Sequence, residues 1–314
     1  MSADCRLCGS RDLDRFERGG WRYARCRGCT TLQKLLTREE YLALEPAYDP
    51  GPAAAFEDGE VRRRYLNVAH NRRFLRSLRM SGAAVRFLDI GCGAGGYLLA
   101  ARELGWEPSG VEPSHEHSTL ARSLGFDVTQ GYFEPGLFGE HRFDVILLSH
   151  VIEHILEPRP FLEGVVSILA PRGKLVLVTP NADAVVARAS GRYWPMLKTI
   201  DHVSLLGPRS VPHLGLERFG RVSTRQLEEL WEASATLGSA SRDLVRERWL
   251  GRRAPSSVGE ARNAAPVTRS GTVRWDRRMR AVRATFAVTS LPIYLLGRAT
   301  GRRACLVIQL ERSS

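Results

Sequence analysis

The 314-residue sequence lacks long apolar runs: no segment reaches 18 uninterrupted apolar residues, and no signal-peptide-like run follows Met1. A membrane-spanning helix needs about 20 such residues. We therefore expect a cytoplasmic protein that does not cross a membrane. Lysine is also scarce, because only three of the 46 basic residues are Lys (Lys34, Lys174 and Lys198). Arginine therefore carries nearly all of the positive charge.

The positive charge is concentrated near the C-terminus. Residues 242–314 contain 16 Arg and five acids, a net +11 out of +12 for the chain. A single basic region argues against nucleic acid as the partner. Within it, 274–303 holds a basic stretch, 14 uncharged residues and three more arginines. This pattern predicts a helix that covers the fold or a partner, and a second interpretation is peripheral contact with the inner face of a membrane.

Four of the six cysteines form two Cys-x-x-Cys pairs, Cys5/Cys8 and Cys26/Cys29, separated by 17 residues. Two such pairs at this spacing are typical of a four-thiolate zinc ribbon. The alternative is two disulfides, which a reducing cytoplasm disfavours. A closed tetrahedral site leaves no position for substrate, so we expect a structural Zn²⁺.

A glycine-rich turn follows the apolar run that ends at Ile90. Backbone N–H groups in such a turn can approach a ligand because no Cβ intervenes. The spacing Gly91-x-Gly93-x-x-Gly96 also fits a dinucleotide site. Two acids favour another ligand: Asp89 precedes the turn, and Glu112 ends the next strand-like run. An amino acid joined to a nucleoside can use both carboxylates, one for its amine and one for its ribose hydroxyls.

Strand and helix patterns alternate along the middle of the chain, which predicts a doubly wound, Rossmann-like α/β sheet. A helix over Thr224–Leu237, a strand near Ser239–Arg246 and a last strand near Ala304–Leu310 would complete seven strands. The predicted organisation is a zinc ribbon (1–36), a helical linker and N-terminal helix (37–84), the core (85–249), a basic insertion with an apolar helix (250–303) and the last core strand (304–314).

Four motifs in order resemble the class I S-adenosylmethionine-dependent methyltransferases: Leu88-Asp-Ile-Gly-Cys-Gly-Ala-Gly95, Gly110-Val-Glu-Pro-Ser114, Phe143-Asp-Val-Ile-Leu-Leu-Ser-His-Val-Ile-Glu-His154 and Pro171-Arg-Gly-Lys-Leu-Val-Leu-Val-Thr-Pro-Asn181. The resemblance implies S-adenosyl-L-methionine as cofactor and a seven-stranded core. The cofactor-binding residues that it implies are Asp89, Gly91, Cys92, Gly93, Gly95, Glu112, Pro113, Ser149 and His150.

Methyl transfer to a hydroxyl needs a group that removes a proton, and a neutral imidazole suits that task. The candidates are His202, with Asp201 as its orienting partner, and His154. The resemblance places 193–202 beside the acceptor, where Tyr193 and Trp194 could stack on a ring. We expect O-methylation of a small hydroxylated acceptor such as a sugar, a glycan or a secondary metabolite. A lipid-linked acceptor is one form that this prediction includes. A nucleic-acid methyltransferase and a non-catalytic cofactor-binding module remain the alternatives.

Overall fold

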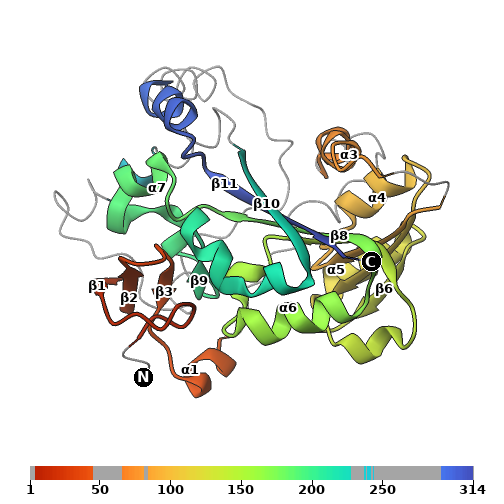
Figure 1. Ribbon diagram of the computed structural model, residues 1–314, viewed down its shortest axis with the longest axis horizontal. Helices are drawn as coiled ribbons and strands as arrows, with labels where there is room; N and C mark the ends of the chain where they lie inside the picture. The colour runs from red at the N-terminus through yellow and green to blue at the C-terminus, as the bar shows by residue number, and fades with distance from the viewer. Residues whose placement is uncertain are drawn as a thin grey trace, which may run out of the picture. The chain divides into compact units, whose positions relative to one another are not determined.

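The structure is a computed structural model that describes residues 4–44, 66–80, 84–227, 237, 239–241, 243 and 291–313 (Figure 1). The chain divides into two compact units. The first comprises Met1–Ala47, Pro180–His213 and Arg225–Leu306, and the second comprises Tyr48–Thr179, Leu214–Thr224 and Val307–Ser314. The N-terminal cysteines therefore belong to one unit, and the glycine-rich turn belongs to the other.

A seven-stranded sheet forms the centre of the second unit, and three of its strands extend into residues assigned to the first. Its strands, in spatial order, are β10 (Gly220–Leu227), β11 (Cys305–Arg312), β8 (Leu169–Pro180), β7 (Phe143–Ser149), β4 (Arg86–Ile90), β5 (Glu107–Glu112) and β6 (Asp127–Gln130). The pairs β8–β7, β7–β4, β4–β5 and β5–β6 are parallel. This order confirms the predicted doubly wound α/β fold. The strand order reverses between β4 and β7, and ligands of such folds bind at the carboxyl ends of the strands around that reversal.

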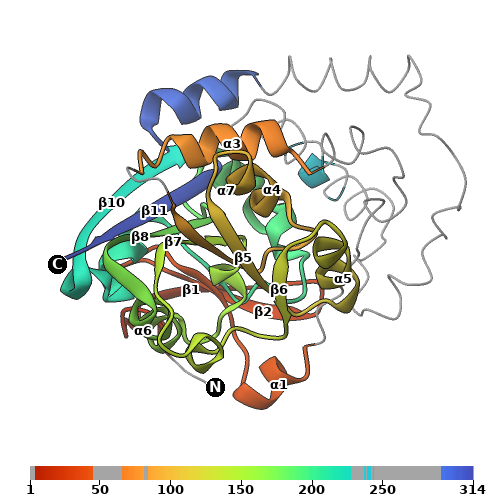
Figure 2. The same ribbon diagram turned by 90° about the vertical axis from the view of Figure 1, so that its right-hand side faces the viewer.

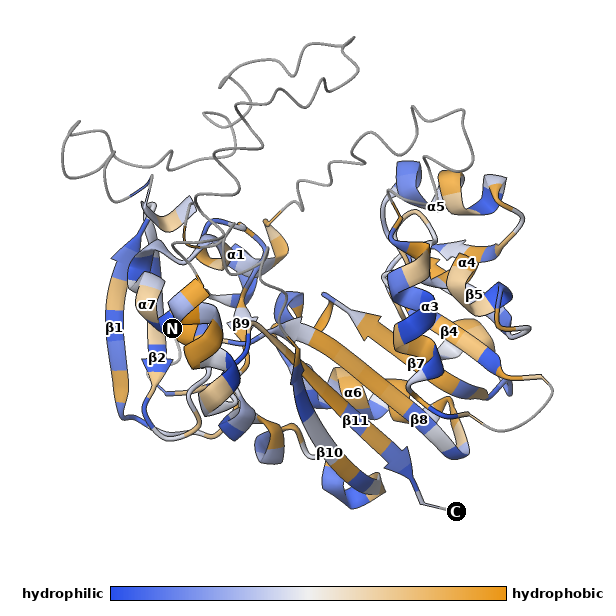
Figure 3. Cartoon of the chain, turned by 90° about the horizontal axis from the view of Figure 1, so that it is seen from above, coloured by the Kyte–Doolittle hydropathy of each residue, from blue (hydrophilic) through white to orange (hydrophobic). Residues whose placement is uncertain are grey.

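Helices cover both faces of this sheet. They are α3 (Val68–Arg76), α4 (Gly96–Arg102), α5 (His115–Ser123) and α6 (Pro158–Ser167). The helices α3 and α4 lie on one face and α6 lies on the other (Figure 2). The centre of β7 and the second half of β8 are apolar (Figure 3), as expected for strands that are buried on both sides. In β7, for example, Val145–Leu148 are all fully buried.

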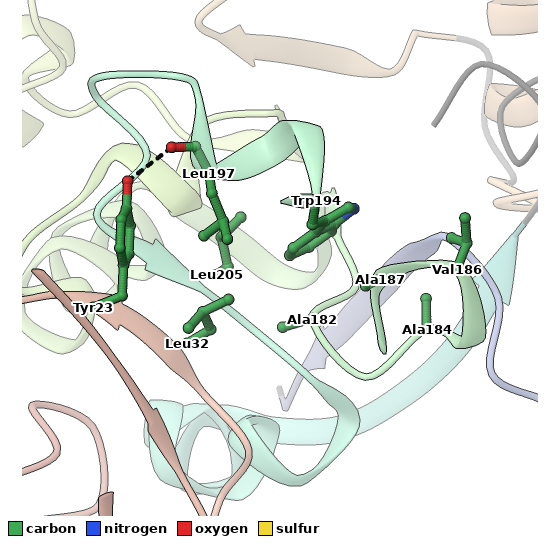
Figure 4. Packing of buried hydrophobic residues seen from close by; sticks show 9 residues of the cluster. All are labelled: Tyr23, Leu32, Ala182, Ala184, Val186, Ala187, Trp194, Leu197 and Leu205. Carbon is green, nitrogen blue, oxygen red and sulfur yellow. Dashed lines mark hydrogen bonds between the residues drawn. The ribbon is translucent and has the colours of Figure 1, made fainter. Parts of the chain in front are cut away.

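The first unit contains a four-stranded sheet in the order β1 (Leu13–Arg18), β2 (Trp21–Cys26), β3 (Leu32–Lys34) and β9 (Ser204–Leu205). The short helices α1 (Arg38–Leu42) and α7 (Val185–Ser190) belong to the same unit. Its apolar core joins Tyr23 and Leu32 of the cysteine-rich part to residues 182–205 (Figure 4). The helix α1 begins after Thr37, because Thr37 and Glu40 form a capping box.

The sheet of the first unit crosses the predicted boundary at residue 36. Its fourth strand comes from much later in the chain: Leu32 pairs with Leu205, and Gln33 pairs with Ser204. Residues 1–36 therefore supply three strands of a sheet that 204–205 complete. Short strands need several partners and an apolar face for stability, so the cysteine-rich segment and 180–213 fold as one unit.

Two predicted elements near the C-terminal part of the core are wrong. Thr224–Leu227, predicted to begin a helix, ends strand β10. The predicted strand near Ser239–Arg246 is helical wherever it is described, at 239–241 and 243. The chain at 224–227 stays in the extended form because β10 pairs with β11 at the edge of the sheet.

The basic insertion is described only at its end. Residues 291–300 are helical, whereas 250–290, including the basic stretch from 274, lie outside the described residues. Within the region predicted as a helical linker and N-terminal helix (37–84), Val68–Arg76 form α3, and 45–65 also lie outside the described residues. Among the helices that the structure describes, none has the length and apolar character needed to cross a bilayer.

Candidate functional site

The glycine-rich turn leaves β4 in a conformation that side chains rarely adopt. Gly91, Gly93 and Gly95 all have positive φ values (75°, 52° and 86°). At Gly91 a Cβ would lie 2.6 Å from Cγ2 of Val151, so a side chain there would clash as well. The turn is fixed by the next strand, because the N–H groups of Gly91 and Cys92 both donate to the carbonyl of Val111. The result is an open backbone cradle ahead of helix α4.

Glu112 completes this cradle from the end of β5. One carboxylate oxygen accepts from the backbone N–H of Gly93 (2.8 Å), and the other accepts from the N–H of Ser114 (2.8 Å). Each oxygen keeps a second lone pair for a ligand hydroxyl. Pro113 lies between these contacts and is half-buried. Glu112 is thus held rigidly at the edge of the glycine-rich turn.

Asp89 is the residue whose environment most clearly calls for a ligand. Its side chain is 1% exposed, and its buried Oδ1 has no hydrogen-bond partner. Burial, reinforced by the nearby charge of Glu112, raises the pKa of Asp89 to about 8. Burial and the charges of Asp89 and Glu112 raise the pKa of Cys92 as well. The Cys92 thiol therefore stays neutral and acts as a small packed side chain. A cationic amine beside Asp89 would supply the missing partner and favour its ionised form.

The end of β7 lies next to the end of β4, since Leu148 pairs with Ile90. Ser149 and His150 follow directly, and His150 takes a left-handed backbone conformation (φ 59°). Its Nδ1 lies 3.1 Å from Oε1 of Glu153. The structure therefore brings all the predicted cofactor-binding residues together at the carboxyl ends of three adjacent parallel strands.

Glu153 was not among the predicted site residues. It is fully buried, and its second oxygen accepts a hydrogen bond from the Thr179 hydroxyl (2.9 Å). The carboxylate thus connects the ends of β7 and β8 through His150 and Thr179. The available signal was its place in His150-x-x-Glu-His154, an acid three residues after a histidine.

The predicted base candidates belong to different units. His154 ends a 3-10 turn in the second unit, whereas Asp201 and His202 belong to the first. His202 is 7% exposed, and its Nδ1 lies 2.9 Å from the carbonyl oxygen of Met196. A carbonyl only accepts hydrogen bonds, so this contact assigns the proton of the neutral ring to Nδ1. The lone pair is then on Nε2, which is the form that a general base requires.

The expectation that Trp194 stacks on a substrate is wrong. Trp194 is 4% exposed and forms part of the apolar core of the first unit (Figure 4). Tyr193 is half-buried, and the guanidinium groups of Arg18 and Arg192 each lie 5.0 Å from its ring centroid. Both aromatic residues therefore have partners within the protein.

The four N-terminal cysteines form a compact cluster. All four are free thiols, and their sulfur atoms lie within 4.8 Å of one another. The Cys5–Cys29 and Cys8–Cys26 sulfur pairs are each 3.5 Å apart. Tetrahedral Zn²⁺ with bonds of about 2.3 Å requires sulfur separations of about 3.8 Å. The donor set and its spacing therefore fit one zinc ion.

A family comparison identifies the fold. The profile of a methyltransferase domain matches residues 21–220, which is more than half of the chain. The chain belongs to the methyltransferase-domain family. The match includes the glycine-rich turn, the strand ends around Asp89 and Glu112, and the 193–202 segment.

Curated relatives and solved structures agree with this family. A ubiquinone biosynthesis O-methyltransferase from Bradyrhizobium diazoefficiens is 32% identical over 128 residues, covering 37% of this chain and 49% of that protein. One from Parvibaculum lavamentivorans is 34% identical over 103 residues, covering 31% and 41%. The chain thus spans about half the length of these relatives or less. Phosphoethanolamine N-methyltransferase 2 from Haemonchus contortus shares the fold, with a TM-score of 0.50, 15% identity and coverage of 96% of this chain and 72% of that one.

Proposed function

We propose that this protein is an S-adenosylmethionine-dependent O-methyltransferase. The observation that carries the cofactor assignment is the buried Oδ1 of Asp89, which has no hydrogen-bond partner and lies near the end of β4, next to the strand that Glu112 ends and just before three glycines with positive φ. Asp89 would hold the amine of the cofactor, Glu112 its ribose hydroxyls, and the glycine-rich turn its amino-acid end. The bound cofactor would supply an electrophilic methyl group. The protein's own task is then to align a nucleophile with that group and remove its proton.

His202 is the proposed general base. Its Nδ1–H is engaged by Met196, so Nε2 can accept the proton of an attacking hydroxyl. Asp201 would favour the imidazolium that results. O-methylation is also the activity in the names of the curated relatives above. We propose a sugar, glycan or secondary-metabolite hydroxyl as the acceptor, and leave His154 as the second candidate base.

The test uses the full-length protein and trideuteromethyl-labelled S-adenosylmethionine with polar, glycan and lipid-linked extracts. Mass spectrometry should detect an acceptor that carries the labelled methyl group on oxygen. A His202→Ala variant should retain cofactor binding and lose roughly a hundredfold or more in turnover, the usual contribution of a general base. Label on nitrogen or carbon would contradict O-methylation, label in RNA or DNA would favour a nucleic-acid enzyme, and cofactor binding without any label would favour the binding module.

We also propose that the four-cysteine cluster holds a structural Zn²⁺. Cys5, Cys8, Cys26 and Cys29 would be its ligands. Such a site has no open coordination position, so it would contribute to folding rather than to methyl transfer. Elemental analysis of protein purified without added metal should give one zinc per chain. A metal-free protein with unchanged melting behaviour would contradict this role.

A lipid-linked acceptor would explain the exposed apolar side of the helix at 291–300. Leu291, Leu295 and Leu296 are 39%, 53% and 51% exposed, and Arg298 lies on the same helix. Leucines beside a guanidinium suit the surface of an acidic bilayer. The double variant Leu295→Ser/Leu296→Ser should sediment less with phosphatidylglycerol vesicles than the unaltered protein does. Equal sedimentation of both proteins would exclude this contact.

A further inference from the structure

Lys34 is a fully buried lysine whose ammonium group contacts backbone rather than a carboxylate. The residue ends β3 and is 1% exposed. Its Nζ donates to the carbonyl of Ile200 and lies 3.5 Å from that of Thr199. Burial lowers the pKa of Lys34 to about 8, while the charge of Asp201 opposes that shift. Burying an ammonium costs free energy unless its hydrogen bonds are satisfied. The two carbonyl contacts therefore offset the cost of burying Lys34.

The carbonyls that Lys34 contacts belong to the segment that carries Asp201 and His202. Residues 198–203 form no helix or strand, so their backbone groups need partners from elsewhere. The cysteine-rich part supplies them. Besides the two Lys34 contacts, the backbone N–H of Lys34 donates to Val203 (3.0 Å), and the Arg6 guanidinium donates to the same carbonyl (3.3 Å).

Tyr23 extends this set of contacts by one more residue. Its hydroxyl donates to the carbonyl of Leu197 (2.8 Å; Figure 4). The carbonyls of Leu197, Thr199, Ile200 and Val203 thus all face donors from β2, β3 or Arg6. The Met196 carbonyl, which accepts a hydrogen bond from His202, lies two residues before residue 198.

The residue type at position 34 is informative. The chain has only three lysines among its 46 basic residues, yet one of them occupies this buried position. Its Nζ lies 4.6 Å from the ring centroid of Trp21 and 5.7 Å from that of Tyr23. The Lys34 ammonium therefore makes cation–π contacts with both rings as well as its contacts with the two carbonyls. A compact ammonium with three rotatable donors differs in this respect from the planar guanidinium fork of arginine.

We propose that Lys34 is a positioning residue, whose ammonium fixes the Thr199–Val203 turn so that Asp201 and His202 are held in one conformation for proton transfer. The inference rests on the proposed function of His202, but the contacts themselves do not. It also gives the cysteine-rich part a role in the reaction: it orders the backbone that carries the base. The ammonium of Lys34 contacts the carbonyls of Thr199 and Ile200, so we expect its loss to leave the cofactor residues and the four cysteines intact.

The test compares full-length, zinc-loaded Lys34→Met with Lys198→Met. Methionine keeps an unbranched stem, one atom shorter than that of lysine, and has no ammonium group to donate to the two carbonyls. Lys198 is a matched control because it lies on the same segment, its side chain is 42% exposed, and its ammonium pairs with a carboxylate, that of Asp243. The first readout is hydrogen exchange of the amides at 197–203. We expect exchange about tenfold to a hundredfold faster in Lys34→Met, as for loss of a charged hydrogen bond, and no change in Lys198→Met.

The second readout is the imidazole nitrogen spectrum of His202 in protein labelled with ¹⁵N-histidine. Lys34→Met should broaden or shift the Nδ1–H tautomer signal, while zinc content and S-adenosylhomocysteine affinity stay unchanged. Once an acceptor has been identified, Lys34→Met should lower kcat by a larger factor than it raises KM. Unchanged exchange and an unchanged His202 tautomer in Lys34→Met would overturn the proposal.

Two further outcomes distinguish the positioning role of Lys34 from the proposed role of His202 as general base. If Lys34→Met loses zinc or fails to fold, Tyr23→Phe serves instead, because it removes only the donor to Leu197. That variant should loosen 196–203 in the same two readouts, and a segment that stays protected would again overturn the inference. If the segment loosens as expected but His202→Ala turns over normally, the positioning contacts are real and the base assignment is the part that fails.

Discussion

Replacing Asp89 by asparagine isolates the charge of the buried carboxylate from the shape of the glycine-rich turn. In the wild type, burial and the charge of Glu112 raise the pKa of Asp89 to about 8. Below that pH the free protein holds a proton on this carboxyl group. A cationic amine bound beside it favours the carboxylate, so cofactor binding should release a proton near neutral pH.

The expected size follows from the titration. A group with a pKa of about 8 is about 10% ionised at pH 7 and about 1% at pH 6, so cofactor affinity should rise about tenfold per pH unit and level off above pH 8. The free energy of unfolding should change with pH in the opposite direction to cofactor affinity. The raised pKa of Asp89 means that the folded state retains the proton more strongly than the unfolded chain does. The stability from this group is present at low pH and is lost as pH rises through about 8.

Calorimetric titration with S-adenosylhomocysteine at pH 6.5, in two buffers of different ionisation enthalpy, counts the protons released. The wild type should release about one proton, and Asp89→Asn should release none and bind more weakly. Asp144→Asn is the matched control: the Arg86 guanidinium lowers the pKa of Asp144, so this acid is ionised before and after binding. Tight wild-type binding that is constant from pH 6 to 8, with no proton released, would refute the reasoning about Asp89.

Two further predictions test the backbone cradle and the cysteine cluster. Gly91→Ala should lower the free energy of unfolding by about 2–4 kcal/mol, from the positive φ and the contact with Val151, as measured by urea denaturation. Adding Val151→Ala should recover only the share of the unfolding free energy that is lost through the contact with Val151. A Gly91→Ala variant as stable as the wild type would show that the turn relaxes freely. Cys26→Ser should abolish stoichiometric zinc and lower the melting temperature by several degrees or more, and retention of one zinc per chain would exclude Cys26 as a ligand.

That the proposed cofactor residues lie close together was predictable from the sequence because these residues are local in the chain. Asp89, the glycines and the start of α4 lie within one strand–turn–helix unit, and Glu112 ends the next strand. Parallel pairing of β4 with β5 then places those strand ends together without further information. What the sequence did not reveal was the electrostatic state. The unpartnered oxygen of Asp89 depends on burial by the whole sheet.

The C-terminal errors have a different cause. Gly220–Leu227 is an edge strand with largely exposed or half-buried side chains, so its apolar pattern is weak. The local sequence therefore favoured a helix over Thr224–Leu237. The strand exists because β11, about 80 residues later in the sequence, pairs with it. A partner that distant leaves no signal in the local pattern.

The first unit shows how far that limitation extends. Cysteine spacing predicted a self-contained ribbon, but nothing in residues 1–36 indicates that β3 pairs with Ser204–Leu205. Lys34 likewise looked like one of many basic residues, since its partners are 165 and 166 positions away. A sequence pattern reports which side chains are apolar or charged, whereas unpaired carbonyls belong to the backbone of every residue alike. The donors that satisfy such carbonyls become visible only once the chain is folded.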